Sequence, residues 1–329
     1  MYDSSDTEYG SFLRRFWKEF SLLVLALIFP TSVYLFCIRA PVAFPTGTIT
    51  AIVRGMTLKQ IAEQLKTEGV VRSALFLELY IHILGGSTGV IAGGYALPEP
   101  ENVFSIGKRI VAGDHQLQTL RITVPEGSTI HDIATILGKS LVAFPEGLFV
   151  AEAQQKEGYL FPDTYFLLPT ATPEEIIKTM GDTFSQKIAT LEKEIKKSNR
   201  PLKDIVTMAS IIEKEAHTSD DRRIISGILW ERLKIGMPLQ VDATFLYING
   251  KNTYDLSVDD LAIDSPYNTY KYAGLPIGPI GNPGLDSLEA ALAPMTSPYL
   301  YYLSDKSGKT YYARTFNEHK RNREKYMQE

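Results

Sequence analysis

The chain has 329 residues, of which 44% are apolar and 22% are charged, enough to bury a core in about two or three domains. Its 34 basic and 38 acidic side chains leave a net charge of -4, which argues against a nucleic-acid partner. Because Cys37 is the only cysteine, intramolecular disulfides and zinc sites built from several cysteines are excluded.

An uncharged apolar run covers residues 20–38 (FSLLVLALIFPTSVYLFCI). Its 19 residues are long enough to cross a bilayer as a helix, with a kink expected at Pro30. The alternative is a cleaved signal peptide, whose apolar region is usually about 7 to 15 residues long and ends in a small-residue cleavage site. This run is longer, and residues 37–40 (CIRA) make a poor cleavage site. We therefore predict a membrane anchor that stays attached.

The orientation of this anchor follows from the charges beside it. Four basic residues flank the span: Arg14, Arg15 and Lys18 before it and Arg39 after it. By the positive-inside rule, this asymmetry places residues 1–19 in the cytoplasm and the chain beyond the span outside. The Pro-, Gly- and Thr-containing residues 39–48 are then predicted to form a short linker.

Two segments, residues 49–65 and 122–137, repeat one pattern of a short strand, a glycine turn and a helix. Each helix has the threonine and the side chain three positions later that form a capping box: Thr57 with Gln60, and Thr129 with Asp132. Helical spacing predicts these buried faces: Leu58, Ile61, Ala62 and Leu65 in the first copy, and Ile130, Ile133, Ala134 and Leu137 in the second.

The repeated unit resembles the LysM-like fold, which recognises glycans that contain N-acetylglucosamine. The alternative is a small packing module that binds nothing. We predict a LysM-like α+β region over residues 49–150 and a second domain over residues 151–329, because the composition shifts near residue 157 to dense aromatic, proline and glycine clusters.

Residues 201–216 (PLKDIVTMASIIEKEA) predict an amphipathic helix with a proline in its first turn. The inward stripe would contain Ile205, Met208, Ala209, Ile212 and Ala216. Glu213 and Glu215 fall on opposite shoulders of this stripe, near the helix end, where the helix dipole and partial burial raise a carboxyl pKa toward that of a general acid. Periodicity does not choose between them, and the alternative is two ordinary surface glutamates.

A second helix should begin at Asp220 and end at Gly236, forming a hairpin with the glutamates near its bend. Three clusters follow, residues 239–247 (LQVDATFLY), 265–270 (SPYNTY) and 274–284 (GLPIGPIGNPG). Polar and aromatic side chains in rigid loops are typical of sites that hold sugars, although a Gly-Pro loop is alternatively a simple turn. Beyond them, residues 299–302 and 310–313 predict a β-hairpin.

Taken together, the motifs have a recognisable order. They are GYLFPDTY at 158–165, MASIIEKE at 208–215, RLKIGMPLQVD at 232–242, YNTY at 267–270 and GLPIGP at 274–279. This set strongly resembles the endolytic murein transglycosylases, the YceG-like or MltG family. A small departure is Ile277, where many relatives carry a second proline.

The resemblance implies an inner-membrane enzyme with an α+β catalytic domain unlike that of lysozyme. It implies cleavage of the MurNAc-GlcNAc β-1,4 bond within peptidoglycan strands, which leaves 1,6-anhydroMurNAc ends and terminates strands near their synthases, the penicillin-binding proteins. In that family the second glutamate of Glu-Lys-Glu is catalytic, which corresponds to Glu215. No cofactor or metal is implied.

We further predict that side chains from several motifs hold the sugars. Those proposed to position the sugar rings are Tyr165, Gln240, Asn268 and Tyr270. The carboxylates assigned to the same substrate site are Asp163, Glu213 and Asp242.

Two other functions remain as alternatives. A glycoside hydrolase would need a second carboxylate, for which Asp163 or Asp242 is available. A glycan-binding scaffold of the synthesis machinery would need neither glutamate. A metalloenzyme is the weakest alternative, because the five histidines are scattered and show no H-x-x-x-H spacing.

Overall fold

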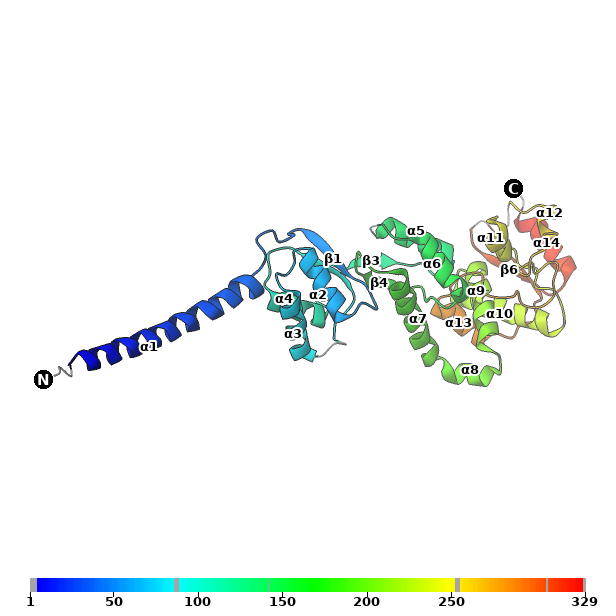
Figure 1. The fold of residues 1–329 in the computed structure, drawn as a ribbon. Coiled ribbons are helices and arrows are strands. Elements are labelled where there is room, and N and C mark those ends of the chain that lie inside the picture. Colours follow the sequence, from blue (N-terminus) through cyan, green and yellow to red (C-terminus); the bar gives the residue numbers. More distant parts are fainter. Residues whose placement is uncertain (1–4, 86–88, 142, 252–254, 306, 328–329) are drawn as a thin grey trace. The chain divides into compact units, whose positions relative to one another are not determined.

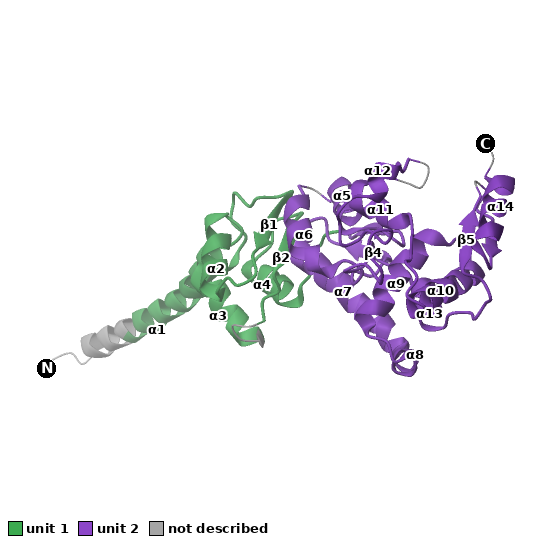
Figure 2. Ribbon diagram, turned by 90° about the vertical axis from the view of Figure 1, so that its right-hand side faces the viewer, with its two compact units in different colours: residues 1–118 green, residues 119–329 purple. Residues whose placement is uncertain are grey.

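The computed structural model describes residues 5–85, 89–141, 143–251, 255–305 and 307–327 (Figure 1). The first four residues of the predicted cytoplasmic segment 1–19 lie outside the described part. The chain divides into two compact units, residues 1–118 and 119–329, coloured green and purple in Figure 2. The division that we predicted after residue 150 therefore falls inside the second unit.

Unit 1 begins with the long helix α1 (Ser5–Val33), which continues into the π-helical turn η1 (Tyr34–Ile38). The stretch Arg15–Ile38 contains an 18-residue window with a mean hydropathy of 2.3, and by length and composition it is able to cross a membrane. Pro30 lies inside α1, close to the point where the α-helix gives way to η1. The predicted apolar span is thus helical along its whole length.

The rest of unit 1 is a β-α-α-β module followed by one helix. The elements are β1 (Thr48–Ile52), α2 (Leu58–Thr67), α3 (Ala74–Gly85), β2 (Gly93–Leu97) and α4 (Val103–Ala112). β1 and β2 pair antiparallel, with Thr48 opposite Leu97. The predicted capping box of Thr57 and Gln60 is confirmed, and the four predicted positions of α2 are buried.

The predicted linker 39–48 is packed against unit 1. Phe44 is buried in the core of the module, and Ile38 and Ala40 pack against the same core. Arg72 Nε also donates a hydrogen bond of 3.2 Å to Ala40 O. No slack chain therefore separates α1 from the module.

Unit 2 opens with a second β-α-α-β module. Its elements are β3 (Leu120–Thr123), α5 (Ile130–Ser140), α6 (Glu146–Ala153), the 3-10 turn η2 (Gln154–Lys156) and β4 (Thr164–Leu167). β3 and β4 pair antiparallel, with Leu120 opposite Leu167. The predicted capping box of Thr129 and Asp132 is confirmed, and the predicted face of α5 is buried. The two repeated segments are therefore the first halves of two β-α-α-β modules, one in each unit.

The remainder of unit 2 is mostly helical. It contains α7 (Pro173–Thr190), α8 (Glu192–Ser198), α9 (Leu202–Glu215), α10 (Ser219–Lys234), α11 (Ala243–Asn249), α12 (Val258–Leu261) and α13 (Leu285–Leu292), then β5 (Tyr301–Ser304), β6 (Thr310–Ala313) and α14 (Phe316–Tyr326). β5 and β6 pair antiparallel, as predicted, with Tyr301 opposite Ala313.

The prediction of an amphipathic α9 is wrong for most of that helix. The five predicted inward residues are buried, but so are Val206, Thr207, Ser210 and Ile211 on the remaining faces. The reason is tertiary, because α10, α11 and α13 all pack against α9. Only the two ends of α9 reach the surface, the first turn with exposed Lys203 and the last turn with both glutamates.

The glycine-rich loop 274–284 is joined to the second module through Asn282. The backbone N–H of Gly127 donates to Asn282 O at 2.7 Å, and Asn282 N–H donates to Ser128 O at 2.9 Å. The buried side chain of Asn282 accepts from Leu160 N–H and donates to Ser128 O and Glu157 Oε1. These bonds hold the loop against the second module, and the backbone N–H of Ile280 donates to Ser210 Oγ of α9 at 3.0 Å.

Candidate functional site

Glu215 is the last residue of α9 and is partly exposed as a residue, although its carboxyl group is buried. Each carboxyl oxygen accepts one hydrogen bond. Tyr302 O–H donates to Oε2 at 3.0 Å, and the backbone N–H of Ala243 donates to Oε1 at 3.4 Å. Both donors come from segments distant in sequence, β5 and the start of α11. The carboxyl group is therefore held in one orientation by two segments, β5 and the start of α11.

The surroundings of Glu215 favour its protonated form. Burial of the carboxyl group raises the pKa of Glu215 to about 7, and the negative charge of Asp242 acts in the same direction. The hydrogen bonds from Tyr302 and Ala243 and the positive charge of Arg232 oppose this rise in pKa. Near neutral pH, the group can thus both give and accept a proton.

Asp242 and Tyr270 form a pair beside Glu215. Tyr270 O–H donates to Asp242 Oδ1, and burial together with this bond raises the pKa of Tyr270. Gln240 lies just before this pair with an exposed side chain, and its φ of +49° belongs to the left-handed region. The structure therefore brings three of the predicted residues, Asp242, Tyr270 and Glu215, into one cluster, with Gln240 at its edge.

Arg232 is buried beneath this cluster. Its Nε donates to Leu300 O at 2.7 Å and its Nη1 donates to Leu239 O at 2.6 Å. Among the described residues Arg232 makes no ion pair, so its charge acts on the cluster as a whole. One side chain thus ties the segment that leads to Tyr302 to the segment that leads to Asp242. Glu215, Asp242, Tyr270, Tyr302 and Arg232 are called the Glu215 cluster below.

Glu213 has a different environment from Glu215. Its side chain is only 5% exposed, and Arg222 Nη2 donates to Glu213 Oε1 at 2.8 Å. Its other oxygen accepts the backbone N–H of Gly284 at 2.8 Å, at the start of α13. Arg222 also pairs with Asp286 at 2.6 Å. Glu213 is therefore a paired carboxylate that holds α10 and α13 against α9.

Three predicted substrate residues do not contact Glu215. Tyr165 is buried in the core of the second module, and its O–H donates to Phe161 O at 2.6 Å. Asn268 is 1% exposed, and its side chain bonds to backbone groups of its own loop, including Tyr270 N–H. Asp163 is exposed and accepts Thr164 N–H before β4. Buried Tyr165 and Asn268 offer almost no surface to a sugar, so their influence on the site passes through the loops that they hold.

A second carboxyl group with a raised pKa lies deeper in unit 2. Burial raises the pKa of Glu157 to about 7, although it accepts hydrogen bonds from Ile130 N–H and Tyr247 O–H. It is only 8% exposed and also bonds to Asn282. This position makes Glu157 part of the joint between the second module and the glycine-rich loop.

Sequence reasoning missed Tyr302, Arg232 and the N–H of Ala243. The sequence does contain a signal for Arg232. It continues the apolar stripe of Ile225, Ile228 and Leu229 on α10 at helical spacing, and this position indicates a buried arginine. Tyr302 carries no such signal, since it lies in a strand with tyrosines on both faces.

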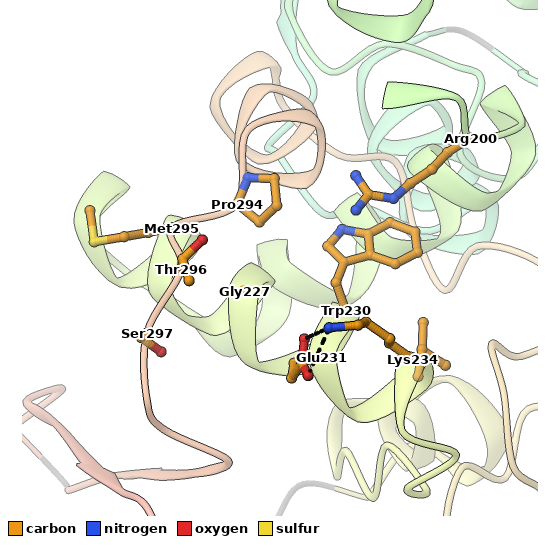
Figure 3. Close-up of a pocket in the computed structure, with 10 residues that line it drawn as sticks. Arg200, Gly227, Trp230, Glu231, Lys234, Pro294, Met295, Thr296 and Ser297 are labelled. Carbon is orange, nitrogen blue, oxygen red and sulfur yellow. Dashed lines mark hydrogen bonds and ion pairs between the residues drawn. The ribbon is translucent and has the colours of Figure 1, made fainter. Parts of the chain in front are cut away.

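A cavity of about 450 Å³ lies on the other side of α10 (Figure 3). It is lined by Arg200, Gly227, Trp230, Glu231, Leu233, Lys234, Pro294, Met295, Thr296 and Ser297. Arg200 stacks 4.0 Å from the ring centroid of Trp230. No member of the Glu215 cluster lines this cavity, because Gly227, Trp230 and Lys234 share the helix face opposite Arg232. It is therefore not the candidate active site.

Metal chemistry has no obvious ligand set in the described part of the chain. No group of three or more His, Cys, Asp or Glu side chains there is arranged to hold a metal ion.

Comparison with known proteins places the chain in a family. The profile of the YceG-like family matches residues 50–325. An endolytic murein transglycosylase of Bacillus subtilis is 35% identical over 300 residues, which cover 83% of this chain and 83% of the relative. One from Streptococcus pneumoniae D39 is 31% identical over 315 residues, covering 82% of this chain and 57% of that relative.

A solved structure agrees with the sequence relatives. The crystal structure of a YceG-like protein from Listeria monocytogenes matches with a TM-score of 0.57 and 32% identity, and it covers 83% of this chain and 98% of the matched one. The family profile extends across both β-α-α-β modules and the Glu215 cluster. The chain belongs to the YceG-like family.

Proposed function

We propose that this protein is an endolytic murein transglycosylase in which Glu215 acts first as an acid and then as a base. Two curated relatives that carry this name align over more than four fifths of the chain. The assignment of Glu215 as the acid and base is supported by its pKa, which burial raises to about 7. Glu213, by contrast, forms an ion pair with Arg222.

In the first step, protonated Glu215 donates its proton to the oxygen that links C1 of N-acetylmuramic acid to C4 of N-acetylglucosamine. The C1–O bond breaks, the N-acetylglucosamine leaves with a neutral hydroxyl, and positive charge develops at C1 of the muramoyl residue. The donors Tyr302 O–H and Ala243 N–H stabilise the carboxylate that remains.

In the second step, ionised Glu215 takes the proton of the muramoyl C6 hydroxyl. The C6 oxygen forms a bond to C1, which closes a 1,6-anhydro ring and returns the proton to Glu215. No water is consumed, so the products together have the mass of the substrate. Ring closure within one sugar depends mainly on its orientation, and exposed Gln240 and the Asp242–Tyr270 pair are the groups proposed to orient it.

A hydrolase remains the second candidate, because Asp242 lies close enough to raise the pKa of Glu215. As a second carboxylate it would activate water or attack C1. Its bond from Tyr270 O–H favours a positioning role, since that bond occupies one carboxylate oxygen. Asp163 makes no contact with the Glu215 cluster and is the weaker partner.

The remaining assignments concern location and partners. The apolar helix Arg15–Ile38 supports a single-pass anchor in the cytoplasmic (inner) membrane, with residues 1–19 inside and the chain beyond the span outside, facing peptidoglycan. The β-α-α-β topology of both modules supports the proposal that they are LysM-like and bind glycan strands. Penicillin-binding synthases are the proposed partners, because they make the strands that this enzyme would cut.

The product of strand cleavage tests the proposed reaction. Purified uncrosslinked glycan strands digested with the full-length protein should yield new internal ends that carry 1,6-anhydro-muramoyl residues. Such ends are lighter than hydrolytic ends by one water, about 18 Da, which mass spectrometry resolves. Reducing ends would instead show a hydrolase, and intact strands would favour a binding scaffold.

The pH profile tests the role of Tyr302. Because the reaction starts from protonated Glu215, kcat/KM should fall as the pH rises through about 7. The Tyr302 hydrogen bond stabilises the anion, so Tyr302→Phe should raise the pKa of Glu215 and move this alkaline limb upward by about one unit. Tyr299→Phe, on the same segment but bonded to neither oxygen of Glu215, should leave the limb unmoved. A limb that stays in place in Tyr302→Phe would remove Tyr302 from the mechanism.

A further inference from the structure

Helix α3 of unit 1 carries an uncovered row of aliphatic side chains. Leu75, Leu79 and Ile83 follow one another at helical spacing and are 66%, 53% and 81% exposed. The other face of the same helix is buried, with Leu77 and Ile81 fully inside the module core. A helix that is apolar on two faces usually buries both of them. The exposed row therefore indicates a second apolar contact, in addition to the contact with the module core.

The position of α3 places this row close to the end of α1. Helix α4 contacts η1, and α3 packs along α4 through ring contacts of Phe76 and Tyr80 with Phe104. One helix of about 10 Å diameter therefore separates α3 from η1. Figure 2 shows α3 on the side of unit 1 from which α1 projects, and in Figure 1 α3 lies at the lower edge of the same unit.

The segment that connects α1 to the β-α-α-β module of unit 1 is packed against that module, so it does not act as a flexible linker. Ile38 and Ala40 pack against the module core, and Arg72 bonds to Ala40 O. If α1 spans a membrane, the surface of that membrane is close to α3. A contact between α3 and the membrane then needs no other protein.

We propose that the face of α3 formed by Leu75, Leu79 and Ile83 inserts into the surface of the lipid bilayer that α1 crosses. This inference rests on the membrane anchor proposed above. Interfacial helices bury their apolar face about 5 to 10 Å into the boundary between headgroups and acyl chains. Unit 1 is then attached at two places, α1 and α3, which stops the rotation about α1 that a single attachment would allow.

Fluorescence quenching in the full-length protein tests this contact. The protein is reconstituted into liposomes of phosphatidylethanolamine and phosphatidylglycerol, and one cysteine is labelled with an environment-sensitive dye. In a Cys37→Ser background, Leu79→Cys and Ile83→Cys report on α3, and Glu63→Cys, on the exposed face of α2, is the matched control. Native Cys37 in the wild-type chain reports on the anchor.

Dyes at positions 79 and 83 should be quenched by lipids with quenchers on their acyl chains and should lose quenching by aqueous iodide. The dye at position 63 should show the opposite pattern. If positions 79 and 83 behave like position 63 while Cys37 is quenched from the lipid, the α3 contact is refuted and the anchor stands. Quenching of Cys37 by iodide alone would refute the anchor itself. Protection of positions 79 and 83 from both quenchers would mean that a protein covers the face, either a second copy or another chain, and would also overturn the proposal.

Discussion

Replacing Glu215 with glutamine is expected to lower strand cleavage by at least about 100-fold, because the amide keeps the size of the side chain but has no proton to give. The amide oxygen can accept the Ala243 N–H while the amide NH2 donates to the hydroxyl oxygen of Tyr302, so the fold around α11 and β5 should survive. The measurement is the rate at which new strand ends form, per mole of protein that a near-ultraviolet circular dichroism spectrum shows to be folded.

Glu213→Gln is the matched control, since it changes a carboxylate two residues away on the same helix turn. Its expected effect on cleavage is smaller, and its main effect should be on stability, because Arg222 would lose one of its two anionic partners. The assignment would be reversed if folded Glu213→Gln were inactive while Glu215→Gln kept the wild-type rate.

Asn282→Leu is expected to cause the largest loss of stability among the substitutions considered. The side chain of Asn282 is fully buried and bonds to Leu160 N–H, Ser128 O and Glu157. Leucine has a similar volume but removes all three side-chain bonds, and a buried polar group that loses its partner costs about 1 to 3 kcal/mol. Leu160 N–H loses its partner, whereas Ser128 O keeps the bond from the backbone N–H of residue 282 and Glu157 keeps its bonds from Ile130 and Tyr247. The loss is a large part of the stability of a typical domain, about 5 to 15 kcal/mol.

Urea denaturation followed by circular dichroism measures this loss as a fall in the transition midpoint. Asn322→Leu is the matched control, because Asn322 is partly exposed and makes one long bond, 3.4 Å, to Tyr312 O. Its midpoint should remain close to that of the wild type. If the two variants had equal midpoints, Asn282 would not be the joint between the second module and the glycine-rich loop.

Local features of this fold could be predicted from the sequence because their causes lie within a few residues. A capping box involves one threonine and the residue three positions later, so Thr57 with Gln60 and Thr129 with Asp132 were predictable. The apolar span, the faces of α2 and α5, and the hairpin of β5 and β6 follow from periodicity in the same way. Family motifs added Glu215, which periodicity alone did not separate from Glu213.

What only the tertiary structure decided depends on contacts between distant segments. Periodicity predicted one buried stripe on α9, but α10, α11 and α13 bury nearly all of it. The return strands β2 and β4, which complete the two modules, pair with β1 and β3 across about 40 residues, and such a pairing is a contact between distant segments.

The two glutamates differ for the same reason. Glu213 meets Arg222 and the start of α13, whereas Glu215 meets Tyr302, which is 87 positions away in the sequence. Burial and nearby charge determine a carboxyl pKa, and both are properties of the packed molecule. The sequence by itself therefore determined the elements and the chemistry available, and the packing of distant loops decided which carboxyl group holds a proton near neutral pH.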